Sequence, residues 1–166
     1  LLFQKVDEIA RMSAKLGDTK QALAAYDYLT KLEKELYSPG GYIKSSVYMN
    51  IADIYMNISE YDKAQNNLTK AMALNTKNNY RFRIPRALIL QAELYLKQKD
   101  TLNAILSYER SIDAAENINA FDVIKSNSLI LTELYNSTNN QAKVFEYKTL
   151  YSVIKDSLFN NEKEQR

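Results

Sequence analysis

The amino-acid sequence predicts an all-α protein, a right-handed superhelix of about four helical hairpins that repeat every 40 residues. Three observations support this fold class. Apolar residues recur at spacings of three and four, which is the period of an amphipathic helix. Gly and Pro are rare, with three and two in 166 residues, and the Asn-Gly pairs typical of β-hairpins are absent. The third observation is a long period, in which Tyr55, Tyr95 and Tyr135 are each followed nine residues later by Ala64, Ala104 and Val144.

Each hairpin is expected to begin with an amphipathic helix. In the range 42–57, "VYMNIADIY" places four residues on one face: Tyr48, Ile51, Ala52 and Tyr55. Equivalent faces are expected in the ranges 2–16 (Val6, Ile9, Ala10), 84–98 (Leu88, Ala92, Tyr95) and 120–137 (Leu131, Thr132, Tyr135). The small residues in this pattern would let two helices approach closely.

The second helices are expected after short polar stretches such as "NISE", "KQKD" and "STNN", with Gly17 as a helix C-cap in the first hairpin. They are predicted over the ranges 18–36, 60–74, 101–116 and 140–159. The "SPGG" at 38–41 is a natural place for two extra residues between the first two hairpins. We therefore expect a single domain over 1–166, with repeats at 2–36, 42–74, 84–116 and 120–159. Residues 160–166 form a polar tail or the start of a linker.

The composition excludes several kinds of chemistry. The chain has no Cys and no His, so a disulfide, a thiolate nucleophile, a Ser-His-Asp triad and an HExxH metal site are excluded. We expect no enzyme activity, no cofactor and no metal site. The 22 basic and 20 acidic residues are balanced, and no apolar run reaches the roughly 20 residues of a membrane span, so direct membrane insertion is not expected.

The small residue in the first helix, the aromatic three residues later and the Ala nine further on resemble the tetratricopeptide repeat. The resemblance covers nearly all of the chain, although its period is 40 residues where the usual repeat has about 34. It implies a tetratricopeptide-type solenoid that binds a protein or peptide without catalysis.

A second resemblance is confined to the end of the chain, chiefly "KDSLFN" at 155–160. This segment is similar to the last helix of tetratricopeptide domains in bacterial membrane-bound sensor histidine kinases and related regulators. It implies the sensor domain of a signal-transduction protein, periplasmic if the parent is membrane-bound and otherwise cytoplasmic. The kinase itself cannot lie in this chain, because a phosphoacceptor His is absent.

The concave face of such a superhelix is lined mainly by the first helix of each hairpin. The repeat register predicts an apolar stripe beside a row of carboxylates on that face. The candidate groove residues are Met49, Asp53, Met56, Arg86, Ile89, Glu93, Leu129 and Glu133. They would suit a segment with apolar side chains and positive charge. Alternatively, the carboxylates are solvated or paired locally, as Glu93 with Lys97, and the Met residues belong to the core.

The stretch "NYRFRIPR" at 79–86 holds Arg81, Arg83 and Arg86, half of the Arg in the chain, next to the start of a helix. These cations either contact an anion or pair with acidic residues nearby. Nucleic-acid binding is not expected, because it requires a continuous basic track.

Two hypotheses of function follow. The first is a protein- or peptide-binding scaffold in bacterial signalling, and the second is a self-association or assembly module of a cell-envelope complex. Apolar residues lie at both ends of the chain: Leu1, Leu2 and Phe3 at the beginning, and Val144, Tyr147, Tyr151, Ile154 and Leu158 near the end. We expect the first set to pack on preceding repeats. The last set has heptad-like spacing, so we expect the last helix to lead into a coiled coil or a dimer contact, with a weak homodimer through the terminal helices.

Overall fold

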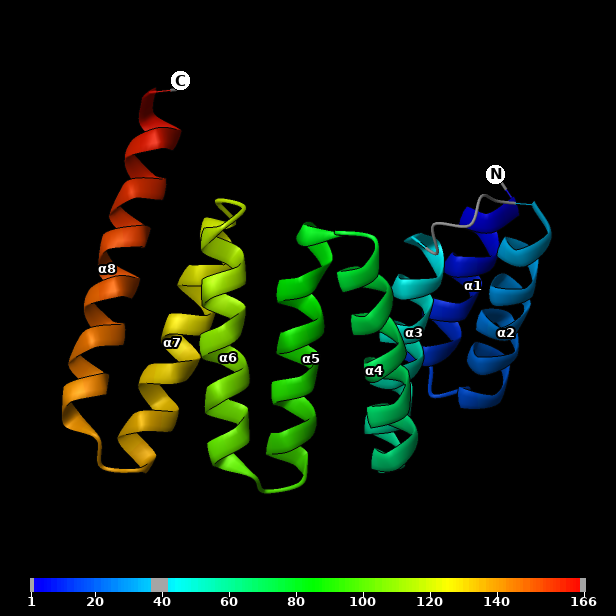
Figure 1. Ribbon diagram of the computed structural model, residues 1–166, viewed down its shortest axis with the longest axis horizontal. Coiled ribbons are helices and arrows are strands. Elements are labelled where there is room, and N and C mark those ends of the chain that lie inside the picture. The colour runs from blue at the N-terminus through cyan, green and yellow to red at the C-terminus, as the bar shows by residue number, and fades with distance from the viewer. Residues whose placement is uncertain (1, 37–41, 165–166) are drawn as a thin grey trace. The chain divides into compact units, whose positions relative to one another are not determined.

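The computed structural model describes residues 2–36 and 42–164, and within these residues helices joined by short turns are the only regular secondary structure (Figure 1). The helices are α1 (Leu2–Lys15), α2 (Thr19–Leu36), α3 (Tyr42–Asn57), α4 (Tyr61–Lys77), η1 (Arg81–Arg83), α5 (Ile84–Lys97), α6 (Thr101–Glu116), α7 (Phe121–Ser137) and α8 (Gln141–Glu164). The stretch at 38–41 lies outside the described residues. The predicted ranges differ most at α4 and α8, which extend beyond residues 74 and 159.

The turn inside each hairpin has the same backbone conformation, and it involves the backbone of the position where Tyr recurs. Left-handed residues occur at Gly17, Ser59, Lys99 and Asn139, all at the same repeat position. The residue after each one donates its N–H to the carbonyl five residues earlier, which belongs to Ser13, Tyr55, Tyr95 and Tyr135, respectively. This is the Schellman motif that ends many helices. The predicted C-cap at Gly17 is therefore confirmed.

Side-chain caps mark the beginnings of several second helices. Asp18, Asp100 and Asn140 each accept the backbone N–H three residues later, at 3.0, 3.1 and 3.2 Å. The side-chain amide of Asn103 also donates to Asp100, at 2.6 Å. These hydrogen bonds from Asn103, the side-chain bond first, hold the pKa of Asp100 below its usual value. Glu60 occupies the same position before α4 and makes no side-chain cap.

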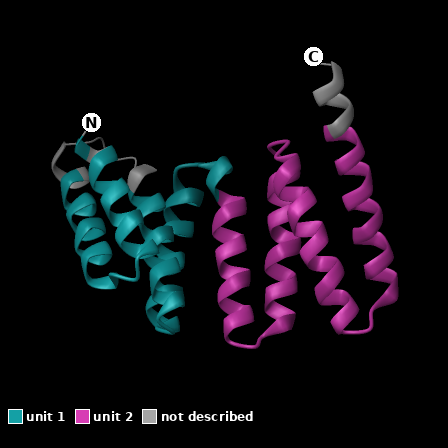
Figure 2. Ribbon diagram, turned by 180° about the vertical axis from the view of Figure 1, so that it is seen from behind, with its two compact units in different colours: residues 1–83 teal, residues 84–166 magenta. Residues whose placement is uncertain are grey.

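The chain divides into two compact units (Figure 2): unit 1 comprises residues 1–83 and unit 2 comprises residues 84–166. In unit 1, the hairpins α1–α2 and α3–α4 pack within themselves, and α2 also packs against α3. The core of unit 1 contains Ala10, Ala22, Tyr26, Leu29, Val47 and Ile54. Our prediction of a single domain stays a prediction.

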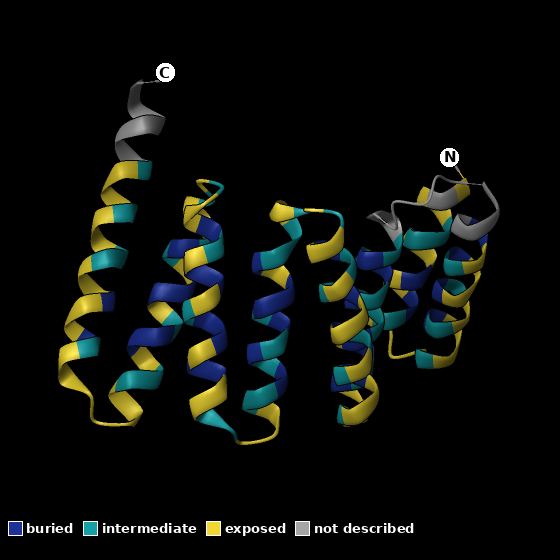
Figure 3. Cartoon of the chain, viewed as in Figure 1, coloured by how far each residue is buried: buried dark blue, intermediate teal, exposed yellow. Residues whose placement is uncertain are grey.

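Unit 2 repeats this arrangement with α5–α6 and α7–α8, and α6 packs against α7. Its core contains Ala92, Ile105, Tyr108, Ile112, Ala115, Ile124, Leu131 and Tyr147. Buried residues alternate with exposed ones along the helices of both units (Figure 3). The small residues Ala52, Ala64, Ala92 and Ala104 are completely buried, as a position of close helix packing requires.

The apolar spacing on α8 is partly used inside unit 2. Val144 and Tyr147 are buried, and Ile154 packs against the unit 2 core. Val144 and Tyr147 therefore belong to the core of their own unit, and the homodimer through the terminal helices stays a prediction. No helix of the described chain is long and apolar enough to cross a membrane.

Candidate functional site

Five of the predicted groove residues lie on unit 2, and four of them form two pairs in which the members are one helical turn apart. Ile89 and Glu93 are on α5, and Leu129 and Glu133 are on α7. Each pair has the spacing i, i+4, which places both side chains on one face of the helix. Leu129 is 47% exposed and Glu133 is exposed, whereas Ile89 and Glu93 are half-buried. Ile89 packs against the unit 2 core. On α7, an apolar side chain and a carboxylate are therefore both accessible.

Two of the predicted groove residues in unit 1 are core residues. Met49 and Met56 are each 1% exposed, so the prediction that they line an open groove is wrong. The reason is their spacing from Ala52: the three residues follow i, i+3, i+7 and share one buried face of α3. Asp53, one residue further along, is exposed. The same spacing was visible in the sequence and could have assigned both Met residues to the core.

The arginine cluster makes contacts with neutral oxygens. The Nε of Arg81 donates to Oδ1 of Asn79 at 3.0 Å, and Nη1 of Arg83 donates to the hydroxyl of Ser46 on α3. Arg81 and Arg83 lie in η1, and Arg86 is exposed in the first turn of α5. The Arg83 contact joins the end of unit 1 to α3, so part of this cluster serves the fold.

A polar network that the sequence did not reveal joins α6, α7 and α8. The hydroxyls of Tyr135 and Tyr147 both donate to Oε1 of Glu109, each at 2.8 Å. The two rings stack, with centroids 5.7 Å apart and planes 8° from parallel. Lys143 lies 4.0 Å from the same Glu109 oxygen and 5.6 Å from the centre of the Tyr147 ring. One carboxylate thus holds three helices together.

The phenols in this part of unit 2 are stabilised in their protonated form. Burial, and then the hydrogen bonds to Glu109, raise the pKa of Tyr135 and Tyr147. Burial, followed by the nearby Glu93 carboxylate, raises the pKa of Tyr108 to about 12. At neutral pH these hydroxyls are hydrogen-bond donors rather than bases or nucleophiles. The network therefore has a structural role.

The described residues contain no group of three or more acidic side chains that could hold a metal ion. The carboxylates of the predicted row lie on separate helices, Asp53 on α3, Glu93 on α5 and Glu133 on α7. What the surface residues offer chemically is apolar contact and carboxylate acceptors.

Comparison with known proteins agrees with this geometry. Residues 44–117 match the family model of the tetratricopeptide repeat. No curated protein matches the sequence of the chain. The matched repeat is not a catalytic family. Residues 44–117 are therefore similar to tetratricopeptide repeats, and the fold class predicted from the sequence, an all-α tetratricopeptide-type repeat of helical hairpins, is confirmed.

Several solved structures share the fold at low sequence identity. BtubC (BKLC) from P. vanneervenii has a TM-score of 0.79 and 15% identity over 95% of this chain, which spans 64% of that protein. A MamA protein has a TM-score of 0.61 and 19% identity over 93% of this chain and 73% of its own. The TPR-like repeats of a putative kinesin light chain from Podosopora anserina have a TM-score of 0.63 and 16% identity, over 91% of this chain and 72% of theirs.

Proposed function

We propose that this chain is a non-catalytic scaffold that binds a protein or peptide segment, as the sensor or interaction domain of a bacterial signal-transduction protein. The observation that carries the proposal is the pairing of Leu129 with Glu133 on the exposed face of α7. An accessible apolar side chain beside a carboxylate suits a segment with apolar and basic side chains. The tetratricopeptide repeats support a scaffold, since stacked helical hairpins provide extended surfaces for binding.

The proposed surface is narrower than the one predicted from the sequence. It comprises Ile89, Glu93, Leu129 and Glu133 of unit 2, and Asp53 is a separate exposed carboxylate on unit 1. Arg86 stays a proposed member at the first turn of α5. Apolar contact is therefore expected mainly on unit 2, because Met49 and Met56 are covered.

A triple charge reversal tests the binding surface. Asp53→Lys, Glu93→Lys and Glu133→Lys together should lower recovery of the native partner at least tenfold in a pull-down from the source cell. The reason is that attraction of these carboxylates to basic side chains of the partner becomes repulsion. Helicity should not change, because these side chains lie on the surface or at its margin. Circular dichroism checks this point.

A matched variant controls for the change in net charge. Asp62→Lys, Asp113→Lys and Glu116→Lys reverse three exposed charges on the second helices α4 and α6. This variant should recover the partner as the parent does. Equal loss in both variants, or equal recovery in both, would remove the groove from the proposal.

The signalling role rests on the resemblance of "KDSLFN" at 155–160 to sensor proteins. The complete reading frame of the parent gene tests it directly. An output domain for signalling in the same protein supports the role, and a parent protein without one contradicts it.

The alternative function is self-association within a cell-envelope complex, through a weak homodimer. One observation favours it: Leu2, Ile9, Met12 and Leu16 are exposed on α1. Val144 and Tyr147 are buried, but Phe145 and Val153 on α8 are exposed, so both terminal helices offer apolar side chains. Sedimentation of the purified chain at rising concentration separates a strict monomer from a dimer.

A further inference from the structure

A row of lysines runs along one side of α4 in unit 1. Lys63, Lys70 and Lys77, which we call the lysine row, are all exposed. Their seven-residue spacing places them on one face of the helix, at intervals of about 10 Å. The stretch 63–83 contains these three Lys, Arg81 and Arg83 but no Asp or Glu. This side of α4 is therefore strongly basic, although the formal net charge of the whole chain is only +2.

Two lysines of the row are held in place by tyrosines of α3. The ammonium group of Lys63 lies 5.6 Å from the centre of the Tyr55 ring, and that of Lys70 lies 5.7 Å from the centre of the Tyr48 ring. Both contacts reach from α4 across to α3. A side chain that is already positioned loses less conformational entropy when a partner binds. The row is thus pre-organised to meet negative charges at regular intervals.

The positive charge of the row is only partly neutralised among the described residues. Lys63 pairs with Glu60 at 3.3 Å, at the beginning of α4. Lys70 and Lys77 form no ion pair with an acidic side chain that the structure describes. Two of the three ammonium groups are therefore available to a carboxylate from another molecule.

Arg81 and Phe82 extend this surface beyond the end of α4. Arg81 is exposed, and its Nε donates to the neutral Oδ1 of Asn79 at 3.0 Å. The Phe82 side chain is 80% exposed. An accessible aromatic ring therefore stands next to a cation at this end of the lysine row.

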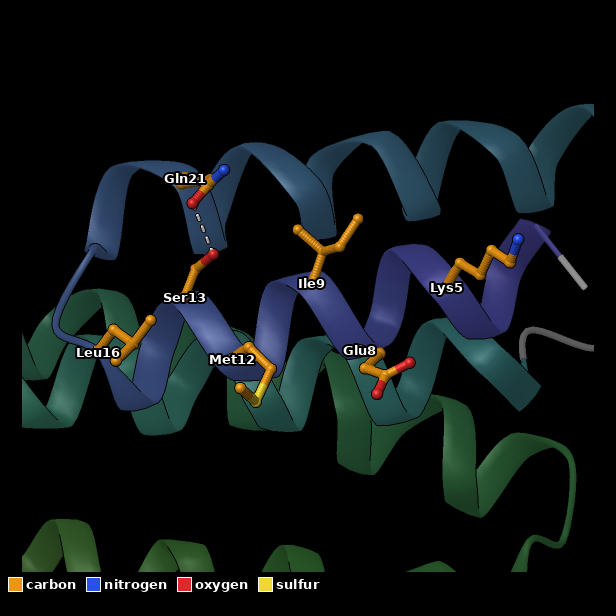
Figure 4. Close-up of a pocket in the computed structure, with 7 residues that line it drawn as sticks. All are labelled: Lys5, Glu8, Ile9, Met12, Ser13, Leu16 and Gln21. Atoms are coloured by element: carbon orange, nitrogen blue, oxygen red, sulfur yellow. Dashed lines mark hydrogen bonds between the residues drawn. The ribbon is translucent and has the colours of Figure 1, made fainter.

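The repeat register shows that the fold does not require the lysine row. In the first hairpin, Ser13 and Gln21 stand at the positions of Tyr55 and Lys63, and the Ser13 hydroxyl donates to Oε1 of Gln21 at 2.8 Å (Figure 4). The two later hairpins have mostly neutral residues at the three positions of the row: Asn103, Arg110 and Asn117, and then Lys143, Leu150 and Ser157. Because these hairpins fold without a basic row, packing does not explain the row on α4.

From these observations we infer that the lysine row is a docking site for an acidic segment of a partner protein, whose carboxylates recur about every 10 Å and pair with the three lysines. A helix with Glu at every seventh position presents carboxylates at this interval. An apolar side chain at one end of the segment contacts Phe82. The row differs in charge from the proposed groove on α5 and α7, and it lies on another helix, so either site can fail without the other.

A nucleic acid fits this surface less well. A duplex carries one negative charge per about 1.7 Å of its axis, and its recognition uses a continuous basic track. The lysine row offers positive charge only at intervals of about 10 Å. The acidic residues Glu60 and Asp62 also stand at its first end. Separate carboxylates on a protein segment match these intervals better than a continuous row of phosphates does.

The test uses the full chain and two designed helical peptides of identical composition. The first peptide carries three Glu residues seven positions apart, which lie on one side of its helix. The second carries them five positions apart, which places them on different sides. Fluorescence anisotropy should show that the first peptide binds at least about fivefold more tightly, because it alone meets all three lysines. This comparison needs no variant of the protein.

Variants of the protein then locate the site. Lys70→Glu with Lys77→Glu should lower the affinity for the first peptide at least about tenfold, because attraction becomes repulsion. Lys148→Glu with Lys155→Glu is the matched control, since these two exposed lysines of α8 have the same spacing. It should leave the affinity within about twofold, because distant surface charges are screened at physiological salt. Circular dichroism checks that both variants stay folded.

A reciprocal exchange of charge makes the assignment specific. The first peptide with Lys in place of each Glu should bind the variant Lys70→Glu with Lys77→Glu more tightly than it binds the parent. Binding of this peptide to the variant and of the original peptide to the parent shows that the charges at these two positions decide recognition.

Four results would overturn the inference. The first is no binding of the Glu peptide at 100 μM. The second is equal binding of the two peptides, which would remove the geometric match. The third is an equal loss of affinity in the two lysine variants, which would reduce the effect to net charge. The fourth is tighter binding of a single-stranded oligonucleotide or of phosphatidylserine vesicles, if Lys70→Glu with Lys77→Glu abolishes it, because this would assign the row to a nucleic acid or a membrane surface.

Discussion

Units 1 and 2 contain the same helical hairpins, yet polar side chains join their helices differently. In unit 2, Nδ2 of Asn127 donates to the Ser111 hydroxyl at 2.9 Å, and that hydroxyl donates to the Pro85 carbonyl at 3.0 Å. This relay links α5, α6 and α7, and Glu109 then links α6 to α7 and α8. Each of these contacts satisfies a donor that the packing takes away from water.

In unit 1 the corresponding polar contact is incomplete. The hydroxyl of Ser45 on α3 donates to Oδ1 of Asn75 on α4, and both residues are completely buried. The amide nitrogen Nδ2 of Asn75 has no hydrogen-bond partner among the described residues. In unit 2 the equivalent residue is Ala115, which is buried and needs no partner. The comparison shows that unit 1 carries the cost of a buried unpaired donor that Ala115 avoids at the equivalent position of unit 2.

The largest effect is expected at Glu109. Glu109→Ala should lower the free energy of unfolding by about 2–4 kcal/mol, because it leaves two phenol hydroxyls without their acceptor. Urea denaturation followed by circular dichroism measures this change. Glu109→Gln keeps one carbonyl acceptor and should cost less than Glu109→Ala. If the two variants were equally stable, the hydrogen bonds would not explain the effect.

The sequence predicted the hairpins better than it predicted these contacts. Helix spacing and turn chemistry are local, so Gly17 and the recurring Tyr residues were sufficient to place the turns. Whether a helix is covered on one side or two depends on neighbours distant in the chain. Met49 and Met56 lie on a covered side of α3, for which their spacing from Ala52 was the one local signal, whereas Asp53 is exposed.

The Glu109 network could not be predicted from the sequence for a similar reason. Tyr135 lies 26 residues and Tyr147 lies 38 residues after Glu109 in the sequence, and each of the three is on a different helix. No short motif connects them. The recurring position of Tyr135 indicated packing, and its hydroxyl partner became visible only when α6, α7 and α8 were placed together.

A second change tests the incomplete contact in unit 1. Ser45→Ala with Asn75→Leu replaces both partners by apolar groups, and Leu has nearly the shape of Asn. The double variant should be as stable as the parent or up to about 1 kcal/mol more stable, because it removes a buried donor without a partner. Urea denaturation measures this as well.

The matched change in unit 2 is Ser111→Ala, which should destabilise by about 1–2 kcal/mol, since it leaves Nδ2 of Asn127 unpaired. If the double variant in unit 1 lost more than about 2 kcal/mol of unfolding free energy, the Ser45–Asn75 contact would be stabilising. It would then act in unit 1 as the Asn127–Ser111–Pro85 relay acts in unit 2.

The smallest effect concerns the helix caps, where the units differ at one equivalent position. Glu60 precedes α4 and makes no side-chain cap, whereas Asp100 precedes α6 and accepts the N–H of Asn103. Their backbones are similar, with φ and ψ of −86° and 64° at Glu60 and −93° and 76° at Asp100. The shorter side chain of Glu60→Asp should therefore reach the N–H of Lys63 and stabilise the protein by about 0.5–1 kcal/mol.

The pH dependence of this gain distinguishes a cap from other causes. The pKa of Asp100 is held below its usual value by its cap, so its contribution is present above the unfolded pKa and is lost as the pH falls through the folded one. The stability gained by Glu60→Asp should depend on pH in the same way as the contribution of Asp100. It should be present above about pH 4 and lost in stronger acid. Glu60→Gln is the control, because it gains no cap. It loses the 3.3 Å ion pair with Lys63, which is worth only a few tenths of a kcal/mol at the surface.

Thermal melting at pH 7 compares the two variants. If Glu60→Asp and Glu60→Gln had the same melting temperature, backbone similarity alone would not be sufficient to produce the cap.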